Sequence, residues 1–111
     1  MTPNKSIEIV DSVRPNPYSE EDKLRWINEL DGTVQRLVFQ NDDIKQYSYP
    51  DDMDTELLIP APFEDLYNLY LEAKIDYHNR EYGNYNNSAM VFESRYDDYK
   101  KWYIRNNPAR R

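Results

Sequence analysis

Apolar side chains recur at spacings of three and four residues in four stretches of the chain, and polar or proline-containing segments separate these stretches. Side chains at these spacings share one face of an α-helix, so the pattern predicts an all-α fold. The expected helices span residues 3–14, 20–40, 62–80 and 86–106. A long acidic loop at 41–56 and a free basic arm at 108–111 complete the predicted organisation.

Several predicted helix ends carry residues that are typical of helix boundaries. Thr2 and Ser19 stand where a hydroxyl caps the first turn, and three acidic residues after Ser19 suit the positive end of the helix dipole. Pro62 suits a first helical turn, because its missing N–H costs nothing there. A turn at Asp31-Gly32 would divide the second helix, but the apolar period continues across this pair in register, which favours one helix.

Two other segments are less regular. Gly83 and Asn84 interrupt the helical pattern, and we expect the break before the last helix to lie within residues 80–87. The apolar run at 57–59 is compatible with a small strand or with an extended connector, because it is too short for its period to decide.

The third predicted helix has an unusually broad apolar face. Its apolar side chains cover roughly 180° of the helical wheel, which is more than one neighbouring helix requires. We therefore expect part of this face to pack at a boundary between subunits. Lys74 lies near the middle of the arc and His78 toward its edge, so each is expected to have a partner or to lay its stem on apolar surface. The residues expected at the boundary are Tyr67, Tyr70, Lys74, His78 and Trp102.

The composition fits one small domain with an aromatic core. A chain of 111 residues has room for a single hydrophobic core, so we expect residues 1–107 to form one helical domain. Eleven tyrosines and two tryptophans supply much of the apolar surface. These residue types are enriched at core edges and also in protein interfaces.

The net charge of −7 is unevenly distributed along the chain. Residues 1–94 hold 19 acidic and 8 basic residues, a net of −11, whereas residues 95–111 hold 6 basic and 2 acidic residues, a net of +4. This asymmetry favours partners of opposite charge and head-to-tail contacts between copies. The acidic body argues against nucleic-acid binding, which depends mainly on neutralising phosphates.

The sequence offers little material for catalysis or ligand binding. His78 is the single histidine and cysteine is absent, and no nucleophile motif accompanies that histidine. The acidic cluster Asp51, Asp52 and Asp54 lacks the glycine and the glutamate spacing of a calcium loop. We therefore expect no enzymatic activity, no cofactor and no metal. No apolar run approaches the ~20 residues of a membrane helix, so no membrane partner is expected.

Four segments, taken in order, resemble a recurring phage protein. They are Trp26–Gly32 (WINELDG), Thr55–Pro62 (TELLIPAP), Tyr70–Asp76 (YLEAKID) and Tyr85–Ser88 (YNNS). Together they are similar to the small helical proteins encoded next to the capsid gene in phages and prophages of Gram-positive bacteria. The resemblance implies a head–tail connector, also called an adaptor or head-completion protein, located in the virion neck after assembly in the cytoplasm of the bacterial host.

The resemblance also implies partners and sites. Copies of the chain are expected to form a ring that binds the portal protein and a tail or stopper protein, while DNA passes through the channel without sequence-specific binding. Arg105, Arg110 and Arg111 are the expected portal-contacting arm. Asp51, Asp52 and Asp54 are expected to line the channel or to contact a partner.

The surplus of carboxylates leaves a second class open, an acidic helical inhibitor or DNA mimic made by a phage against a host enzyme. A mimic would spread its acidic groups over an exposed face at phosphate-like spacing. Here many of them lie in one loop and the C-terminal end is basic, so the charge pattern favours the connector.

Overall fold

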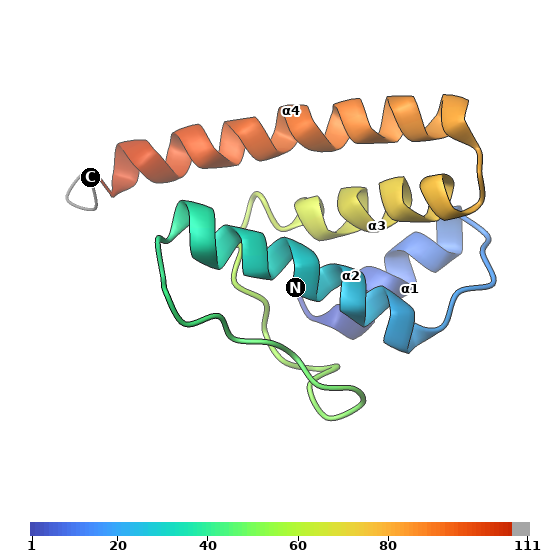
Figure 1. The fold of residues 1–111 in the computed structure, drawn as a ribbon, viewed down its shortest axis with the longest axis horizontal. Coiled ribbons are helices and arrows are strands. Elements are labelled where there is room, and N and C mark those ends of the chain that lie inside the picture. Colours follow the sequence, from blue (N-terminus) through green and yellow to red (C-terminus); the bar gives the residue numbers. More distant parts are fainter. Residues whose placement is uncertain (108–111) are drawn as a thin grey trace.

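Four α-helices and one short π-helix form the fold, and a long irregular segment joins its two halves (Figure 1). The computed structural model describes residues 1–107, and the arm expected at 108–111 lies outside this range. The helices are α1 (Pro3–Val13), α2 (Glu20–Thr33), the π-helix η1 (Val34–Val38), α3 (Asp65–His78) and α4 (Tyr82–Asn106). The described residues form no strand, so the prediction of an all-α fold with about four helices is confirmed.

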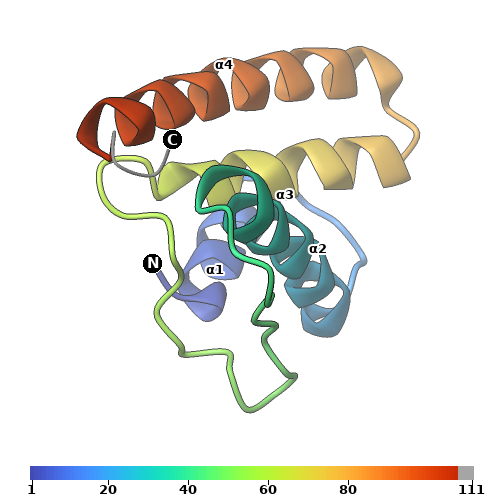
Figure 2. The ribbon, with the colours of Figure 1, turned by 60° about the vertical axis from the view of Figure 1, so that its left-hand side comes forward.

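The third helix, α3, lies at the centre of the fold. It packs against α1, α2 and α4, with α1 and α2 below it and α4 along its opposite side (Figures 1 and 2). Its buried residues are Leu66, Tyr67, Leu71, Ala73, Ile75 and Asp76. Three helices of the same chain therefore account for the broad apolar face, and a second subunit is not required to explain its width.

The first two helices begin where the caps predict. The Thr2 hydroxyl accepts a hydrogen bond from the Lys5 N–H at 3.2 Å, and the Ser19 hydroxyl accepts one from the Asp22 N–H at 3.1 Å. Both hydroxyls satisfy backbone donors that have no partner inside the helix. The helix α2 continues through Asp31-Gly32, so a turn at that pair is excluded.

The second predicted helix ends differently from the expectation. Its last part forms the wider turn of η1, in which the Phe39 N–H donates to the Val34 carbonyl at 2.9 Å. Gln40 then takes a left-handed conformation with φ 60°, which ends the helix. Apolar periodicity does not distinguish an α-turn from a π-turn, because both place similar side chains toward the core.

The boundaries predicted for the third and fourth helices are partly wrong. Pro62 lies in a turn before α3, which starts at Asp65; the Ala61–Pro62 peptide bond is cis. The last helix starts at Tyr82, and Gly83 lies inside its first turn. The chain reverses at Arg80, which has a positive φ of 62° and lies within the range 80–87 expected for the break.

The acidic loop is part of a longer segment between η1 and α3 that is tied to the helices. The Asn28 side chain donates to the Tyr47 carbonyl at 3.0 Å and accepts from the Tyr47 N–H at 2.8 Å. Gln35 pairs with the backbone of Lys45 in the same way, at 2.9 and 2.8 Å. The buried side chains of this segment are Met53, Leu57, Ile59 and Phe63. The run at 57–59 is thus a buried connector and not a strand.

Candidate interaction surface

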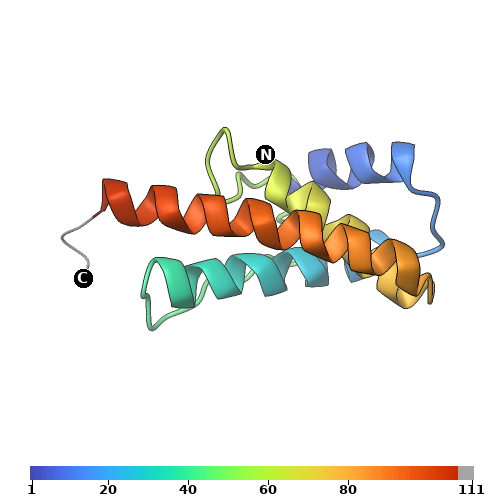
Figure 3. The same ribbon diagram turned by 90° about the horizontal axis from the view of Figure 1, so that it is seen from above.

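The helix α4 is the element most open to solvent. It has 25 residues, and Tyr99 is the one residue among them that is buried. Seen from above, α4 runs across the molecule, with α1 and α2 on either side of it (Figure 3). Met90 and Val91 on its outer side are 71% and 54% exposed. Neighbouring exposed apolar side chains of this kind are typical of surfaces that contact other molecules.

An aromatic seam holds α4 against α3. The rings of Tyr70 and Phe92 lie 5.2 Å apart, and those of Tyr77 and Tyr85 lie 5.3 Å apart. Near the start of α3, Arg95 lies 4.6 Å from the centre of the Phe63 ring. It also donates to the Pro62 carbonyl at 2.8 Å. Ring pairs at these distances add to the burial of apolar surface, so α4 is firmly placed although one side stays open.

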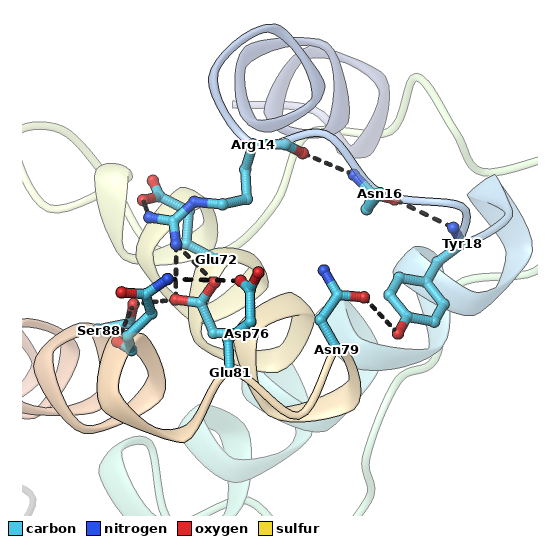
Figure 4. Close-up of polar contacts among 9 residues, drawn as sticks. Arg14, Asn16, Tyr18, Glu72, Asp76, Asn79, Glu81 and Ser88 are labelled. Atoms are coloured by element: carbon cyan, nitrogen blue, oxygen red, sulfur yellow. Dashed lines mark hydrogen bonds and ion pairs between the residues drawn. The ribbon is translucent and has the colours of Figure 1, made fainter.

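A polar cluster joins α1, α3 and α4 near the end of α3 (Figure 4). The Arg14 guanidinium donates to both carboxylate oxygens of Asp76, at 2.5 and 2.6 Å, and to Glu72 at 2.9 Å. The Ser88 hydroxyl on α4 donates to the same Asp76 carboxylate. Asp76 has no exposed surface. Each oxygen of this buried carboxylate therefore has a donor, and the cluster fixes the three helices relative to one another.

A second buried carboxylate connects α2, the long segment and α3. Asp31 accepts hydrogen bonds from the hydroxyls of Tyr67 at 2.5 Å and Tyr47 at 2.7 Å. The Leu58 N–H lies 3.4 Å from it, and the Ile59 N–H donates to the Tyr67 hydroxyl at 2.9 Å. Burial raises the pKa of Asp31, and the hydrogen bonds from the two tyrosines act in the opposite direction.

Sequence reasoning did not identify either carboxylate, although one signal was present. Asp31 follows Ile27 by four residues and precedes Val34 by three, so it occupies the apolar face of its helix. An acidic residue in such a position has to find buried donors. The phenol groups that supply them come from residues far away in the sequence, and spacing alone does not reveal them.

The five residues expected at a subunit boundary do not form one surface. Tyr67 has no exposed surface, so the expectation is wrong for this residue. Trp102 packs against Phe63 at the start of α3, whereas His78 ends that helix and stacks on Trp26 at 5.1 Å. The Lys74 ammonium pairs with Glu29 at 3.0 Å and lies over the Tyr70 ring. The partners expected for Lys74 and His78 are therefore present within the same chain.

Asp51, Asp52 and Asp54 lie together in one turn of the loop. Asp52 accepts hydrogen bonds from the Ser48 N–H at 2.7 Å and the Thr55 hydroxyl at 3.4 Å, and Asp54 accepts one from Asn4 at 2.8 Å. Asp51 is exposed. Two of the three residues thus stabilise the turn. Among the arm residues, Arg105 is exposed in the last turn of α4, and Arg110 and Arg111 lie outside the described residues.

A small hollow of about 100 Å³ separates the end of α4 from η1. Larger and more open hollows lie on the two sides of the α3–α4 pair, one beside Tyr77 and Tyr85 and the other beside Met90 and Val91. Every one of these hollows borders α4. The lining residues of the small hollow are Leu37, Val38, Gln40, Lys100, Tyr103, Ile104 and Asn107.

Comparison with known protein families, with curated proteins and with solved structures gave no significant match to this chain. Within residues 1–107, no group of three or more acidic or histidine side chains is arranged to hold a metal ion. No helix in that range is long and apolar enough to cross a membrane.

Proposed function

We propose that this protein is a head–tail connector, a structural adaptor in the neck of a tailed phage particle. The observation that carries the proposal is the open side of α4, where Met90 and Val91 are exposed on a helix that is otherwise firmly packed. A rigid helix that presents two exposed apolar side chains suits contact with other protein chains. The four segments that resemble phage neck proteins supply the biological setting.

The buried carboxylates support this role because they make the domain a stiff building block. The Arg14–Asp76 pair fixes α1 to α3, and Asp31 fixes the long segment to the core. A part of a ring must present its contact surfaces at constant angles, since small angular errors accumulate around a closed assembly. Polar networks that are fully paired favour such a defined geometry.

The proposed partners are further copies of the chain, the portal protein and a tail or stopper protein. The basic end of α4, with Arg105, is proposed to reach the portal. The acidic turn with Asp51 is proposed to face the channel or a partner. With its excess of acidic groups, the body of the protein would repel passing DNA without trapping it.

The test is to mix the purified protein with the portal ring encoded in the same genome and to examine the mixture by electron microscopy. We expect an added layer on the portal. The double variant Met90→Glu/Val91→Glu should lose this layer. Lys5→Glu on α1 is the matched control, because it changes the net charge by the same two units at an exposed site.

Failure of the unaltered protein to bind the portal would contradict the proposal. Recovery of a host nuclease or polymerase from lysate, in place of the portal, would favour the acidic inhibitor.

A further inference from the structure

The hollow between η1 and the end of α4, called here the η1–α4 hollow, combines apolar walls with exposed aliphatic side chains. Val38 and Tyr103 line it and are half-buried. Leu37 and Ile104 also line it, and they are 67% and 44% exposed. Two large aliphatic side chains beside one small hollow form a surface that loses water favourably when a partner covers it.

The charged groups around the η1–α4 hollow are basic. Lys100 lines it, Arg36 precedes Leu37, and Arg105 follows Ile104. No ion pair in the described part of the chain involves any of these three residues. Among residues 1–107, no carboxylate lines the hollow. A partner that fits it therefore combines an apolar or aromatic side chain with acidic groups.

The acidic turn at residues 48–55, called here the loop tip, has this chemistry. The Tyr49 ring is 44% exposed and stands two residues before Asp51, which is also exposed. No hydrogen bond or ion pair described within residues 1–107 involves the Asp51 carboxylate. The loop tip thus offers one aromatic ring beside an unpaired negative charge.

The loop tip is held in shape before any partner binds. The Asp52 N–H donates to the Ser48 carbonyl at 2.8 Å, and the Asp52 carboxylate accepts from the Ser48 N–H. The Asn4 N–H donates to the carbonyl of Met53, whose side chain is buried. A preformed turn loses little conformational entropy on docking, so a small contact area can still yield specific binding.

The two surfaces lie at different ends of the α2–η1 helical rod in one copy. Tyr49 lines a hollow together with Glu21 and Arg25 in the first half of α2, whereas Leu37 and Val38 belong to η1. The twelve residues from Arg25 to Leu37 correspond to roughly 18 Å along a helix. The loop tip of one copy is therefore remote from the η1–α4 hollow of the same copy.

We infer that the loop tip of one copy docks in the η1–α4 hollow of the next copy. Tyr49 contacts Leu37 and Ile104, and Asp51 faces Lys100. The contact joins two different patches, so it is heterologous, and successive copies form a closed ring or an open chain. The pairwise contact is inferred from the apolar and charge complementarity alone. The closure of such contacts into a ring rests on the proposed connector function.

Disulfide trapping tests the contact directly, because the chain contains no cysteine. The full-length variants Tyr49→Cys and Ile104→Cys are mixed at high protein concentration under mild oxidation, with one of them labelled with ¹⁵N so that mixed dimers are distinguished by mass. We expect the mixed disulfide to form on the order of tenfold faster than the disulfide between Tyr49→Cys and Met90→Cys. Met90 is the control, because it is more exposed than Ile104 and lies on the outer side of the same helix. Equal rates for the two pairs would overturn the inference.

A charge exchange tests the ionic part of the contact. Lys100→Glu, added to the Ile104→Cys chain, should slow trapping severalfold at low salt. Asp51→Lys, added to the Tyr49→Cys chain, should then restore the rate. Circular dichroism melting of each variant confirms that the fold is kept. A charge exchange that restores nothing would overturn the pairing of Asp51 with Lys100.

The trapping experiment and the portal experiment test the two proposals separately. Portal binding without preferential trapping would overturn this contact and leave the connector role standing. Preferential trapping without portal binding would support the contact and contradict the connector role.

Discussion

The hydroxyl of Tyr67 on α3 donates a 2.5 Å hydrogen bond to the carboxylate of Asp31 on α2, and neither side chain has exposed surface. Tyr67 was expected at a subunit boundary, but it is buried inside one chain. The continuous helix expected across Asp31 is present as part of α2. Both residues belong to the core. Neither side chain is therefore available to a second subunit, and our proposals place the assembly contacts on α4 and on the loop.

Removing the Tyr67 hydroxyl should destabilise the protein. Tyr67→Phe deprives Asp31 of one donor and the Ile59 N–H of its acceptor, so we expect a loss of about 1–3 kcal/mol in the free energy of unfolding. Urea unfolding measures the loss. Tyr99→Phe is the matched control, because Tyr99 is equally buried and its hydroxyl has no hydrogen-bond partner among the described residues. A similar loss in both variants would contradict the assigned role of the Tyr67–Asp31 bond.

The raised pKa of Asp31 determines the direction in which the stability of the protein changes with pH. Because the folded protein holds the proton more tightly than the unfolded chain, the Asp31 contribution is fully present below the ordinary pKa of 3.8 and is lost as the pH rises through the folded value. The unaltered protein should therefore gain stability relative to Asp31→Asn as the pH falls from neutral toward that range. Unfolding free energies of both proteins across this pH range provide the test. A difference that stays constant with pH would contradict the assignment.

Breaking the Arg14–Asp76 pair should be costly. Arg14→Met leaves the buried Asp76 carboxylate without its charged partner, and we expect a loss on the order of 3 kcal/mol. The Arg14 side chain is 28% exposed, so solvent screens part of the interaction. The expected loss of stability is therefore small for a buried ion pair. Thermal and urea unfolding measure it. Lys101→Met is the control, since it breaks an exposed pair with Asp97 and should change stability little. A loss in Arg14→Met that is no larger than the loss in Lys101→Met would contradict a structural role of the cluster.

Replacing Gly83 by alanine tests where α4 begins. Gly83 lies in the first turn of the helix, its φ is not positive, and a Cβ there would meet open space. Alanine should therefore stabilise the protein by about 0.4–1 kcal/mol, because it reduces the freedom of the unfolded chain and favours the helix. Thermal unfolding measures this gain. A loss of stability would indicate that the helix begins later, near residue 86.

The sequence carried enough information to predict the helices but not their mutual packing. Apolar period and hydroxyl caps placed α1 and α2, since both signals act within one helix. The sequence indicated a broad apolar face on α3, but it did not show what covers that face, because the number of helices around α3 depends on how distant segments fold back. Gly83 was taken as a helix breaker, although a glycine in a first turn is tolerated and the reversal falls at Arg80.

The sequence predicts the candidate surfaces only in part. The charge asymmetry along the chain favours head-to-tail contacts, which stay a prediction, and residues 41–56 form a loop as expected. The η1–α4 hollow requires two segments more than sixty residues apart in the sequence, so neither Leu37 nor Ile104 could be recognised as part of a site. Met90 and Val91 were likewise assigned to no surface, because the side of α4 that faces solvent depends on where α3 packs.

The most direct test of the connector proposal is a cryo-electron microscopy reconstruction of the portal ring bound to this protein. We expect an added ring in which the outer side of α4, at Met90 and Val91, contacts another protein chain while the α3 face stays inside each subunit. A portal that stays bare at every protein concentration, or a bound protein whose α4 remains open to solvent, would contradict the account.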